Sequence, residues 1–212
     1  MAVTIESSGE FGDSVYDGRA AAYDRLIGSR WYNRLLWDAS PDDYAAFAQR
    51  AVDSAPGPLL DVAAGTASAT CEAYRTSDRM IVLTDSSRDM LTQAARRLAG
   101  DGQLRPGMRF VQADAFDLQF APGGFDTVVS LGFLHLVADA VGFVDGLRAQ
   151  VRPGGQVFLS SLVAATAVGT RYLRVLHRLG EVAEPRTADD LADLFDTSVR
   201  RRGSMAYLEL TV

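Results

Sequence analysis

Cysteine and histidine are scarce in this chain of 212 residues, and lysine is absent. Its single cysteine, Cys71, excludes an intrachain disulfide and is expected to be a small core residue. All 21 basic residues are arginine, and the net charge of -6 argues against a nucleic-acid partner, because neutralising phosphates requires a basic face. The two histidines leave few acid/base candidates, and no metal site is predicted.

Long apolar segments are also missing. The first residues lack the basic start and apolar run of a secretory signal, and no later segment approaches the length of a membrane span. We therefore predict a cytoplasmic protein with no membrane partner. The length suits one α/β domain with modest additions, long enough to bury a core.

From residue 59 onward, short runs rich in Val, Leu, Ile and Phe alternate with helical runs. Strands are predicted at 59–63, 80–85, 108–114, 125–133 and 156–163, and helices at 69–74, 86–100, 134–152, 170–180 and 187–195. Such alternation is typical of a parallel sheet covered on both faces. Gly203 and Ser204 separate two final strand-like runs. We predict an α/β fold, a Rossmann-like, doubly wound, mostly parallel seven-stranded sheet that ends in an antiparallel hairpin.

The first 52 residues are predicted to form an N-terminal helical lid. Residues 1–14 are polar and are interpreted as a frayed tail or flap. The remainder is helical in pattern, and a helix that begins at Asp42 would place Tyr44, Phe47, Ala48 and Val52 on one face. Residues 53–212 would form the core, with an insertion near 164–185. Together the lid and the insertion would wall an acceptor pocket with some of the aromatic residues Tyr16, Tyr23, Trp31, Tyr32 and Trp37.

The stretch LLDVAAGTASAT, residues 59–70, places a loop of small residues between a buried strand and a helix, where nucleotide-like cofactors bind. Asp61 lies inside the strand; it either caps the loop's own amides or also reaches a cofactor ammonium. A dinucleotide fingerprint requires three glycines, and here Ala63, Gly65 and Ser68 occupy those places. No arginine stands near the loop in the sequence. A cofactor without phosphates is therefore favoured.

The carboxyl ends of parallel strands meet at one edge of the sheet, which is where ligands bind. Asp85 ends the second strand, 20 residues after Gly65, at the spacing where an acid meets ribose hydroxyls. Its alternative role is an exposed acid that caps the helix starting at Ser86. Asp114 ends the third strand, and the fourth ends near Ser130 and Leu131.

Taken in order, these motifs resemble the class I S-adenosylmethionine-dependent methyltransferases, in particular the small-molecule branch of the ubiquinone/menaquinone type. LLDVAAGTA resembles the first motif of that family, IVLTDSSRDMLTQAARR the second, and FVQADAFDLQFAPGGFDTVVS the third and fourth. RPGGQVFL resembles the turn before the fifth strand, and YDGRAAAYDRL is similar to the lid segment. The likeness runs from about Tyr16 to the C-terminus.

The resemblance implies S-adenosyl-L-methionine as cofactor and a role for each motif residue. Asp61, Ala63 and Gly65 would approach the methionine ammonium, Asp85 would hold the ribose, and Asp114 the adenine amino group. The full implied cofactor set is Tyr16, Tyr23, Asp61, Ala63, Ala64, Gly65, Thr66, Asp85, Ser86, Met90, Asp114, Ala115, Phe116, Ser130 and Leu131. Two alanines, Ala63 and Ala67, stand where the family usually has glycine, and their methyl groups narrow the loop.

Methyl transfer from a sulfonium is an in-line displacement, so holding the acceptor near the methyl group can supply most of the catalysis. His135 follows the fourth strand and is the candidate general base; its alternative role is a structural cap of the next helix. His177 lies off the face made by Tyr172, Val175, Leu176 and Leu179, and is interpreted as a surface or pocket-rim residue.

The leading hypothesis is methyl transfer to a small, apolar or aromatic metabolite. The second is a nicotinamide-dependent oxidoreductase on a related fold, and the third a methyltransferase-like protein that binds the cofactor without transferring methyl groups. The expected partner is a small-molecule substrate, with room for a homodimer.

Overall fold

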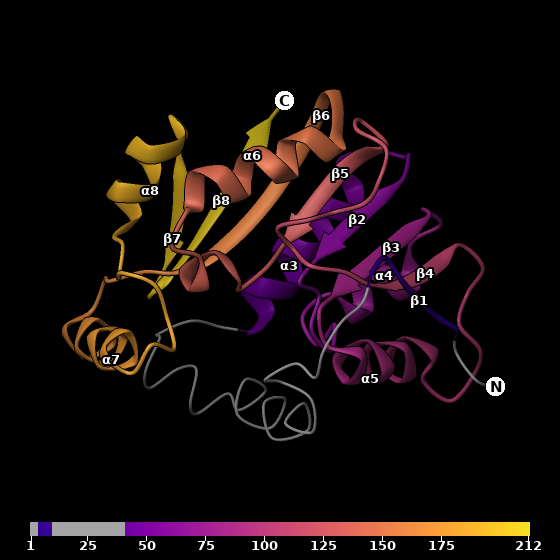
Figure 1. The fold of residues 1–212 in the computed structure, drawn as a ribbon, viewed down its shortest axis with the longest axis horizontal. Coiled ribbons are helices and arrows are strands. Elements are labelled where there is room, and N and C mark those ends of the chain that lie inside the picture. Colours follow the sequence, from indigo (N-terminus) through magenta and orange to yellow (C-terminus); the bar gives the residue numbers. More distant parts are fainter. Residues whose placement is uncertain (1–3, 10–40) are drawn as a thin grey trace.

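The centre of the molecule is one eight-stranded sheet (Figure 1). The computed structural model describes residues 4–9 and 41–212. The strand order is β1-β4-β3-β2-β5-β6-β8-β7. The bounds are β1 Ile5–Ser7, β2 Leu59–Val62, β3 Ile81–Asp85, β4 Met108–Gln112, β5 Phe125–Ser130, β6 Val151–Leu162, β7 Val199–Arg202 and β8 Met205–Thr211.

All neighbouring strands from β1 across to β6 pair in parallel, whereas β8 pairs antiparallel with both β6 and β7. The order along the sheet reverses between β2 and β5, which is the switch point where doubly wound sheets bind ligands. The predicted fold, a mostly parallel Rossmann-like sheet that ends in an antiparallel hairpin, is confirmed.

The predicted count of seven strands is wrong by one, because β1 adds an eighth at the edge. Ile5 pairs with Phe110 of β4, and Glu6 forms a surface ion pair with Arg109 at 2.6 Å. Interpreting residues 1–14 as a frayed tail is therefore wrong for Ile5–Ser7. Three residues with one apolar side chain carry no detectable period, and it is the open backbone edge of β4 that gives them hydrogen-bond partners.

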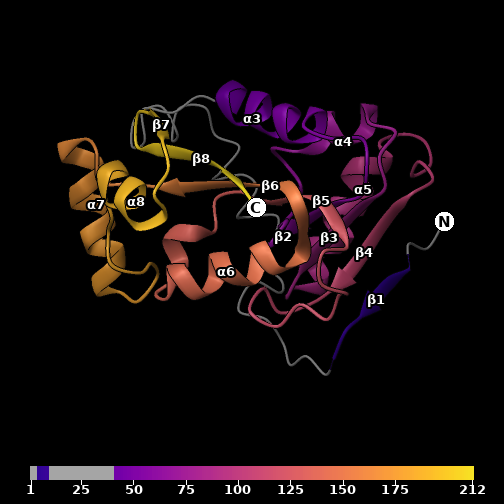
Figure 2. The same cartoon turned by 90° about the horizontal axis from the view of Figure 1, so that it is seen from above.

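Helices cover both faces of the sheet (Figure 2). One face carries α3, α4 and α5, and the other carries α6 and α8. The bounds are α3 Pro41–Asp53, α4 Cys71–Thr76, α5 Arg88–Ala99, α6 Ala140–Gln150, α7 Ala167–Arg178 and α8 Ala188–Phe195, with a short 3₁₀ helix, η2, at Leu134–Leu136.

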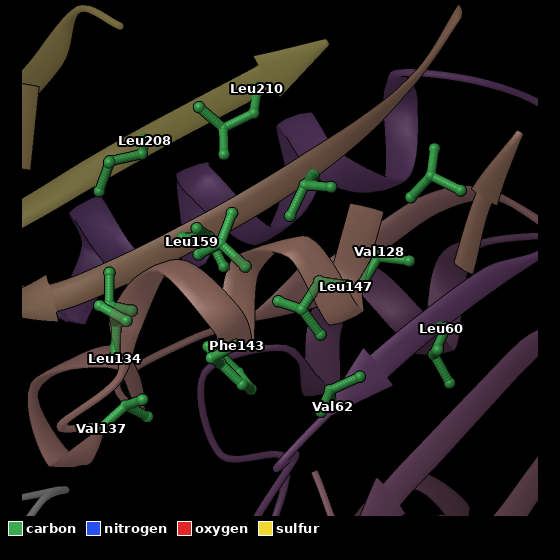
Figure 3. Packing of buried hydrophobic residues seen from close by; sticks show 14 of the residues in the cluster. Leu60, Val62, Val128, Leu134, Val137, Phe143, Leu147, Leu159, Leu208 and Leu210 are labelled. Atoms are coloured by element: carbon green, nitrogen blue, oxygen red, sulfur yellow. The ribbon is translucent and has the colours of Figure 1, made fainter. Parts of the chain in front are cut away.

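The core is built from apolar side chains that alternate between the two faces of each central strand. In β2, Leu60 and Val62 pack toward α6, while Leu59 packs toward α3 and α4. Figure 3 shows the first of these clusters, where Phe143 and Leu147 of α6 lie against the sheet. Each such side chain, when fully buried, contributes roughly 1.5–3 kcal/mol. This packing fixes where the strands end, and so where the loops at the carboxyl edge begin.

Two local predictions differ from the structure. The helix predicted at 134–152 begins only at Ala140, because the Asp139 side chain accepts a hydrogen bond from Gly142 N and caps it there. The run Arg200, Arg201 and Arg202 is the one basic run in the sequence and predicts a solvated strand face, but Arg200 is half-buried, with its guanidinium 5.0 Å from the centre of the Tyr207 ring. Strand residues alternate between faces, so a charged run on a strand cannot lie entirely in solvent.

Candidate functional site at the carboxyl edge of the sheet

The loop after β2 bends through three left-handed residues. Ala63, Gly65 and Ala67 have φ of 56°, 56° and 54°. A Cβ added at Gly65 would meet nothing within 4 Å, so this side of the loop faces open space. Ala63 and Ala67 stand where the family usually has glycine. Because their φ is positive, the left-handed backbone at each alanine costs roughly 1–2 kcal/mol. The loop is strained where a ligand would approach it.

Hydrogen bonds from two neighbouring elements hold this loop in place. Gly65 N donates to Asp85 Oδ2 at 2.8 Å, and Ala64 N donates to Thr84 O at 2.9 Å. The Arg97 guanidinium, from α5, donates to Thr66 O. An arginine therefore does contact the loop, although none stands near it in the sequence. This arginine binds a loop carbonyl. The contact could not be predicted from the sequence, because it forms only when α5 packs beside the loop.

Asp85 joins the loop to the start of α5. Besides Gly65 N, its carboxylate accepts from Ser87 N at 2.9 Å. The cap of α5 is Ser87, whose side chain accepts from Met90 N, so the alternative role of Asp85 as cap of a helix starting at Ser86 is wrong. Ser86 itself is exposed. The half-buried carboxylate is placed against the open loop, as a ribose-binding acid requires.

Asp61 is almost completely buried, with 2% of its surface exposed. Its carboxylate accepts a hydrogen bond of 2.9 Å from the Tyr74 hydroxyl, so its partner comes from α4. Burial raises the pKa of Asp61 to about 7, while the Tyr74 hydrogen bond lowers the pKa and the nearby Asp85 raises it. Among the described residues, no loop amide donates to Asp61. Tyr74 carries no sequence signal beyond its place in a helix.

The end of β4 presents an acid and an aromatic ring together. Asp114 is exposed, and its Oδ1 accepts from Phe116 N at 2.9 Å, which leaves Ala115 at the turn between them. Phe116 is 61% exposed, yet its ring centre lies 5.6 Å from that of Phe143. A flat exposed ring held beside a carboxylate can stack on a base and accept from its amino group.

The end of β5 meets the described part of the N-terminal region. Ser130 is buried, and its hydroxyl has no hydrogen-bond partner in the part of the chain that the structure describes. Beyond the half-buried Leu131, Gly132 N donates to Ser160 Oγ at 2.8 Å, and Ser160 Oγ donates to the Tyr44 hydroxyl at 2.8 Å. A Cβ at Gly132 would lie 2.6 Å from that hydroxyl, so α3 approaches the sheet edge closely here.

His135 lies in η2, beside the end of β6. Leu162 N donates to its Nδ1 at 3.5 Å, so the neutral ring carries its proton on Nε2. Although some of its surface is exposed, burial lowers the pKa of His135 to about 4. The adjoining cavity, lined by Ser161 and Glu184, measures about 10 Å³, which is room for one water. His177, by contrast, is exposed on α7, as predicted.

Of the remaining predicted residues, some lie in the described part of the chain and some lie outside it. Met90 is 3% exposed in the first turn of α5. In α3, Phe47, Ala48 and Val52 are buried and Tyr44 packs beside them, as the helical pattern predicts. Five aromatic residues of the predicted lid lie outside the described residues: Tyr16, Tyr23, Trp31, Tyr32 and Trp37.

The donors and acceptors along this edge fit an adenosine-bearing, phosphate-free ligand. Two carboxylates, Asp85 and Asp114, end adjacent strands, and the described cation that contacts the loop, Arg97, is directed at Thr66 O. Phosphates need several amide or cationic donors, whereas carboxylates accept from hydroxyl, amino and ammonium groups. No group of three or more metal-ligating side chains occurs among the described residues.

Comparison with known proteins agrees with this chemistry. Residues 60–159 match the family described as methyltransferase domain. The chain is 34% identical to a demethylmenaquinone methyltransferase of Clavibacter sepedonicus over 148 residues, which are 69% of this chain and 56% of the relative. The chain thus spans about half the length of that curated relative.

Two solved structures share the fold. Phosphoethanolamine N-methyltransferase 2 of Haemonchus contortus, in complex with S-adenosyl-L-methionine, superposes with a TM-score of 0.63 at 18% identity, over 87% of this chain and 43% of that one. The [4+2]-cyclase SpnF superposes with a TM-score of 0.65 at 20% identity, over 91% and 72%. At these identities the likeness shows the fold alone.

The Rossmann-like sheet, the loop after β2 and the acids at the ends of β3 and β4 agree with a class I S-adenosylmethionine-dependent methyltransferase, and residues 60–159 of the chain are similar to the methyltransferase domain family. Relatives of the chain include a demethylmenaquinone methyltransferase and a ubiquinone/menaquinone biosynthesis C-methyltransferase. These similarities leave the nicotinamide-dependent alternative without support.

Proposed function

We propose that this chain transfers the methyl group of S-adenosylmethionine to a small, apolar or aromatic acceptor related to a quinol. The observation that carries the proposal is the contact between Gly65 N and Asp85, which sets a carboxylate against the open side of the loop at the switch point of the sheet. The aromatic acceptor is favoured by the similarity to a demethylmenaquinone methyltransferase.

In this proposal each strand end binds one part of the cofactor. Asp85 accepts from the ribose hydroxyls with Ser86 beside it, and Asp114, with Ala115 and Phe116, holds the adenine over Met90. Asp61 and the loop residues Ala63, Ala64, Gly65 and Thr66 lie at the methionine end, together with Ser130 and Leu131. Tyr16 and Tyr23 are proposed to cover the bound cofactor.

Most of the rate enhancement is assigned to positioning. An in-line displacement at the sulfonium needs the nucleophile held near the methyl group and water excluded. His135 is proposed as a polar group at the edge of the acceptor pocket, because the cavity directly beside it has room for one water only. Its lowered pKa keeps the ring neutral at pH 7, but a group with a pKa near 4 is a weak general base at that pH. Replacement by Asn therefore should reduce turnover modestly, by about tenfold or less.

Calorimetric titration tests the cofactor assignment. S-adenosylhomocysteine should bind, NADH should not, and Asp85→Asn should weaken S-adenosylhomocysteine binding by at least about tenfold, because a ribose hydrogen bond to a charged group is lost. Asp101→Asn is the matched control, since Asp101 is exposed in the loop after α5. Equal affinity of both variants, or binding of NADH alone, would contradict the assignment.

Methyl transfer from labelled cofactor to a demethylated menaquinol analogue tests the acceptor.

We also propose a cytoplasmic protein with a small-molecule substrate. Among the described residues no helix is long and apolar enough to cross a membrane. The net charge of -6 supports a partner other than nucleic acid. Light scattering of the purified chain decides between a monomer and a homodimer.

A further inference from the structure

Helix α7 exposes a stripe of apolar side chains. Val168, Val175 and Leu179 are 59%, 44% and 69% exposed. Their spacing of seven and four residues places them on one face of the helix and its C-cap. Of the face made by Tyr172, Val175, Leu176 and Leu179, only Tyr172 and Leu176 pack with the buried Leu173, which is 1% exposed, whereas Val175 and Leu179 are exposed. The helix is bound to the fold by one side and leaves a second apolar side uncovered.

The same helix carries an unbalanced positive charge. Arg171, Arg174 and Arg178 are exposed, and α7 contains no acidic residue. None of the three arginines forms an ion pair with a described residue. At 100° per residue they lie beside the apolar stripe. A cationic flank beside exposed aliphatic side chains is typical of helices that lie in the surface of a lipid bilayer.

Contrary to the sequence-based prediction of no membrane partner, we propose that α7 docks this protein on the surface of an anionic lipid bilayer, with the stripe Val168, Val175 and Leu179 in the interface and the three arginines at the lipid headgroups. The helix lies at one end of the molecule in both views, where it can meet a flat surface (Figures 1 and 2). A second copy of the chain is a poorer occupant, because pairing two α7 helices would bring six guanidinium groups together.

Acidic groups near α7 limit how it can approach such a surface. Glu181 and Glu184 follow the helix, and α8 exposes Asp189 and Asp193. Asp190 of α8 is engaged by Thr187 at the helix start. Docking therefore requires the stripe and its arginines to face the bilayer while α8 turns away, and the acids make binding weak and reversible.

This docking gives the proposed function a route to its acceptor. Leu173 of α7 packs with Leu162 and Leu136, which flank His135. The helix on the bilayer would thus lie next to the acceptor pocket, so an apolar acceptor could enter from the lipid phase. This last step rests on the proposed methyl transfer, whereas the docking itself does not.

Cosedimentation with vesicles tests the docking on the full chain without cofactor. Vesicles of phosphatidylcholine with and without phosphatidylglycerol are compared at low and high salt. The partition coefficient should rise with the anionic lipid, fall with salt, and drop about fivefold for each arginine replaced among Arg171→Gln, Arg174→Gln and Arg178→Gln. The double variant V175D/L179D should abolish partitioning while leaving the far-ultraviolet circular dichroism unchanged.

Matched controls separate docking from general surface effects. Val141 of α6 is 44% exposed, like Val175, and Arg96 of α5 is exposed, so Val141→Asp and Arg96→Gln should partition like the unmodified chain. Equal binding to neutral and anionic vesicles, no binding to either, or a dimer that only V175D/L179D dissociates would overturn the proposal. Titration of S-adenosylhomocysteine on the same variants reports on the proposed function independently.

Discussion

Two alanines in the loop after β2 show how a single methyl group affects backbone strain and packing at the site. Ala63 and Ala67 have positive φ where glycine would be unstrained. Replacement by glycine removes that strain but makes the unfolded chain more flexible, and the two effects nearly cancel. Ala67 is also 2% exposed, so its methyl group contributes packing that Ala63 lacks.

Ala63→Gly should therefore change the free energy of unfolding by less than about 1 kcal/mol, whereas Ala63→Val should lower it by about 2 kcal/mol, because a β-branched residue is poorly tolerated at positive φ. Urea denaturation measures both. If the loop is narrowed by its methyl groups, Ala63→Gly should also bind S-adenosylhomocysteine more tightly in calorimetric titration. A valine variant as stable as the unmodified chain would mean that residue 63 is not left-handed in solution.

The buried Asp61 should make stability depend on pH. Burial raises its pKa in the folded chain to about 7, above the usual value of 3.8. The folded chain prefers Asp61 protonated. The free energy of unfolding therefore has its full value below about pH 4 and falls as the pH rises toward 7. Relative to Asp61→Asn, the unmodified chain should lose up to about 4 kcal/mol over that range and then level off.

Denaturation midpoints of the two proteins across pH 4–8 give this difference directly. Tyr74→Phe serves as the companion variant, because it removes the hydrogen bond that lowers the pKa of Asp61 and so should shift the loss to higher pH. Parallel pH profiles for the unmodified chain and Asp61→Asn would show that Asp61 is charged in the folded state throughout.

At the scale of elements, one buried arginine links α3 to the amino edge of the sheet. Arg79 is 6% exposed; it donates to Ala51 O at 3.0 Å, to Val52 O at 2.8 Å and to Gly57 O at 2.6 Å. A further bond reaches Thr127 Oγ1 of β5 at 2.8 Å. The guanidinium thus satisfies the last carbonyls of a helix, where positive charge is also favoured by the helix dipole.

Arg79→Met should lower the free energy of unfolding by about 3 kcal/mol or more, since it leaves these buried carbonyls without donors. Arg109→Gln is the matched control: Arg109 is half-exposed in an ion pair with Glu6, so its loss should cost less than about 1 kcal/mol. Urea denaturation compares the two. Equal small losses would mean that water replaces Arg79 at the end of α3.

Contacts between elements are the part of the structure that the sequence does not predict. The strands from β2 to β6 are predictable because each is a run of apolar residues bounded by turn signals, and Asp85 and Asp114 follow because parallel strands end at one edge. The partners Tyr74 and Arg97 are not predictable, because they reach Asp61 and Thr66 only once α4 and α5 pack against the loop. Backbone acceptors such as those of Arg79 leave no sequence pattern at all.

On the scale of the whole molecule, the proposed cofactor touches segments that lie far apart in the chain. The loop after β2 and the ends of β3, β4 and β5 lie on four neighbouring strands of one sheet. A ligand that binds only when all four are correctly placed binds the folded chain and not the unfolded one. Such a ligand stabilises the fold by mass action. The gain in the free energy of unfolding depends on the ligand concentration relative to its dissociation constant.

S-adenosylhomocysteine at about 100 times its dissociation constant should therefore add about 2.7 kcal/mol to the free energy of unfolding, which raises Tm by about 5–10 °C for a chain of this length. NADH at the same concentration should leave Tm unchanged, and S-adenosylhomocysteine at that concentration should add about 1.4 kcal/mol or less to Asp85→Asn, because binding at least about tenfold weaker halves the stabilisation. Scanning calorimetry measures all three. A shift with NADH, or an equal shift for Asp85→Asn, would mean that the ligand does not bridge the loop and the end of β3 as Gly65 and Asp85 do in the structure.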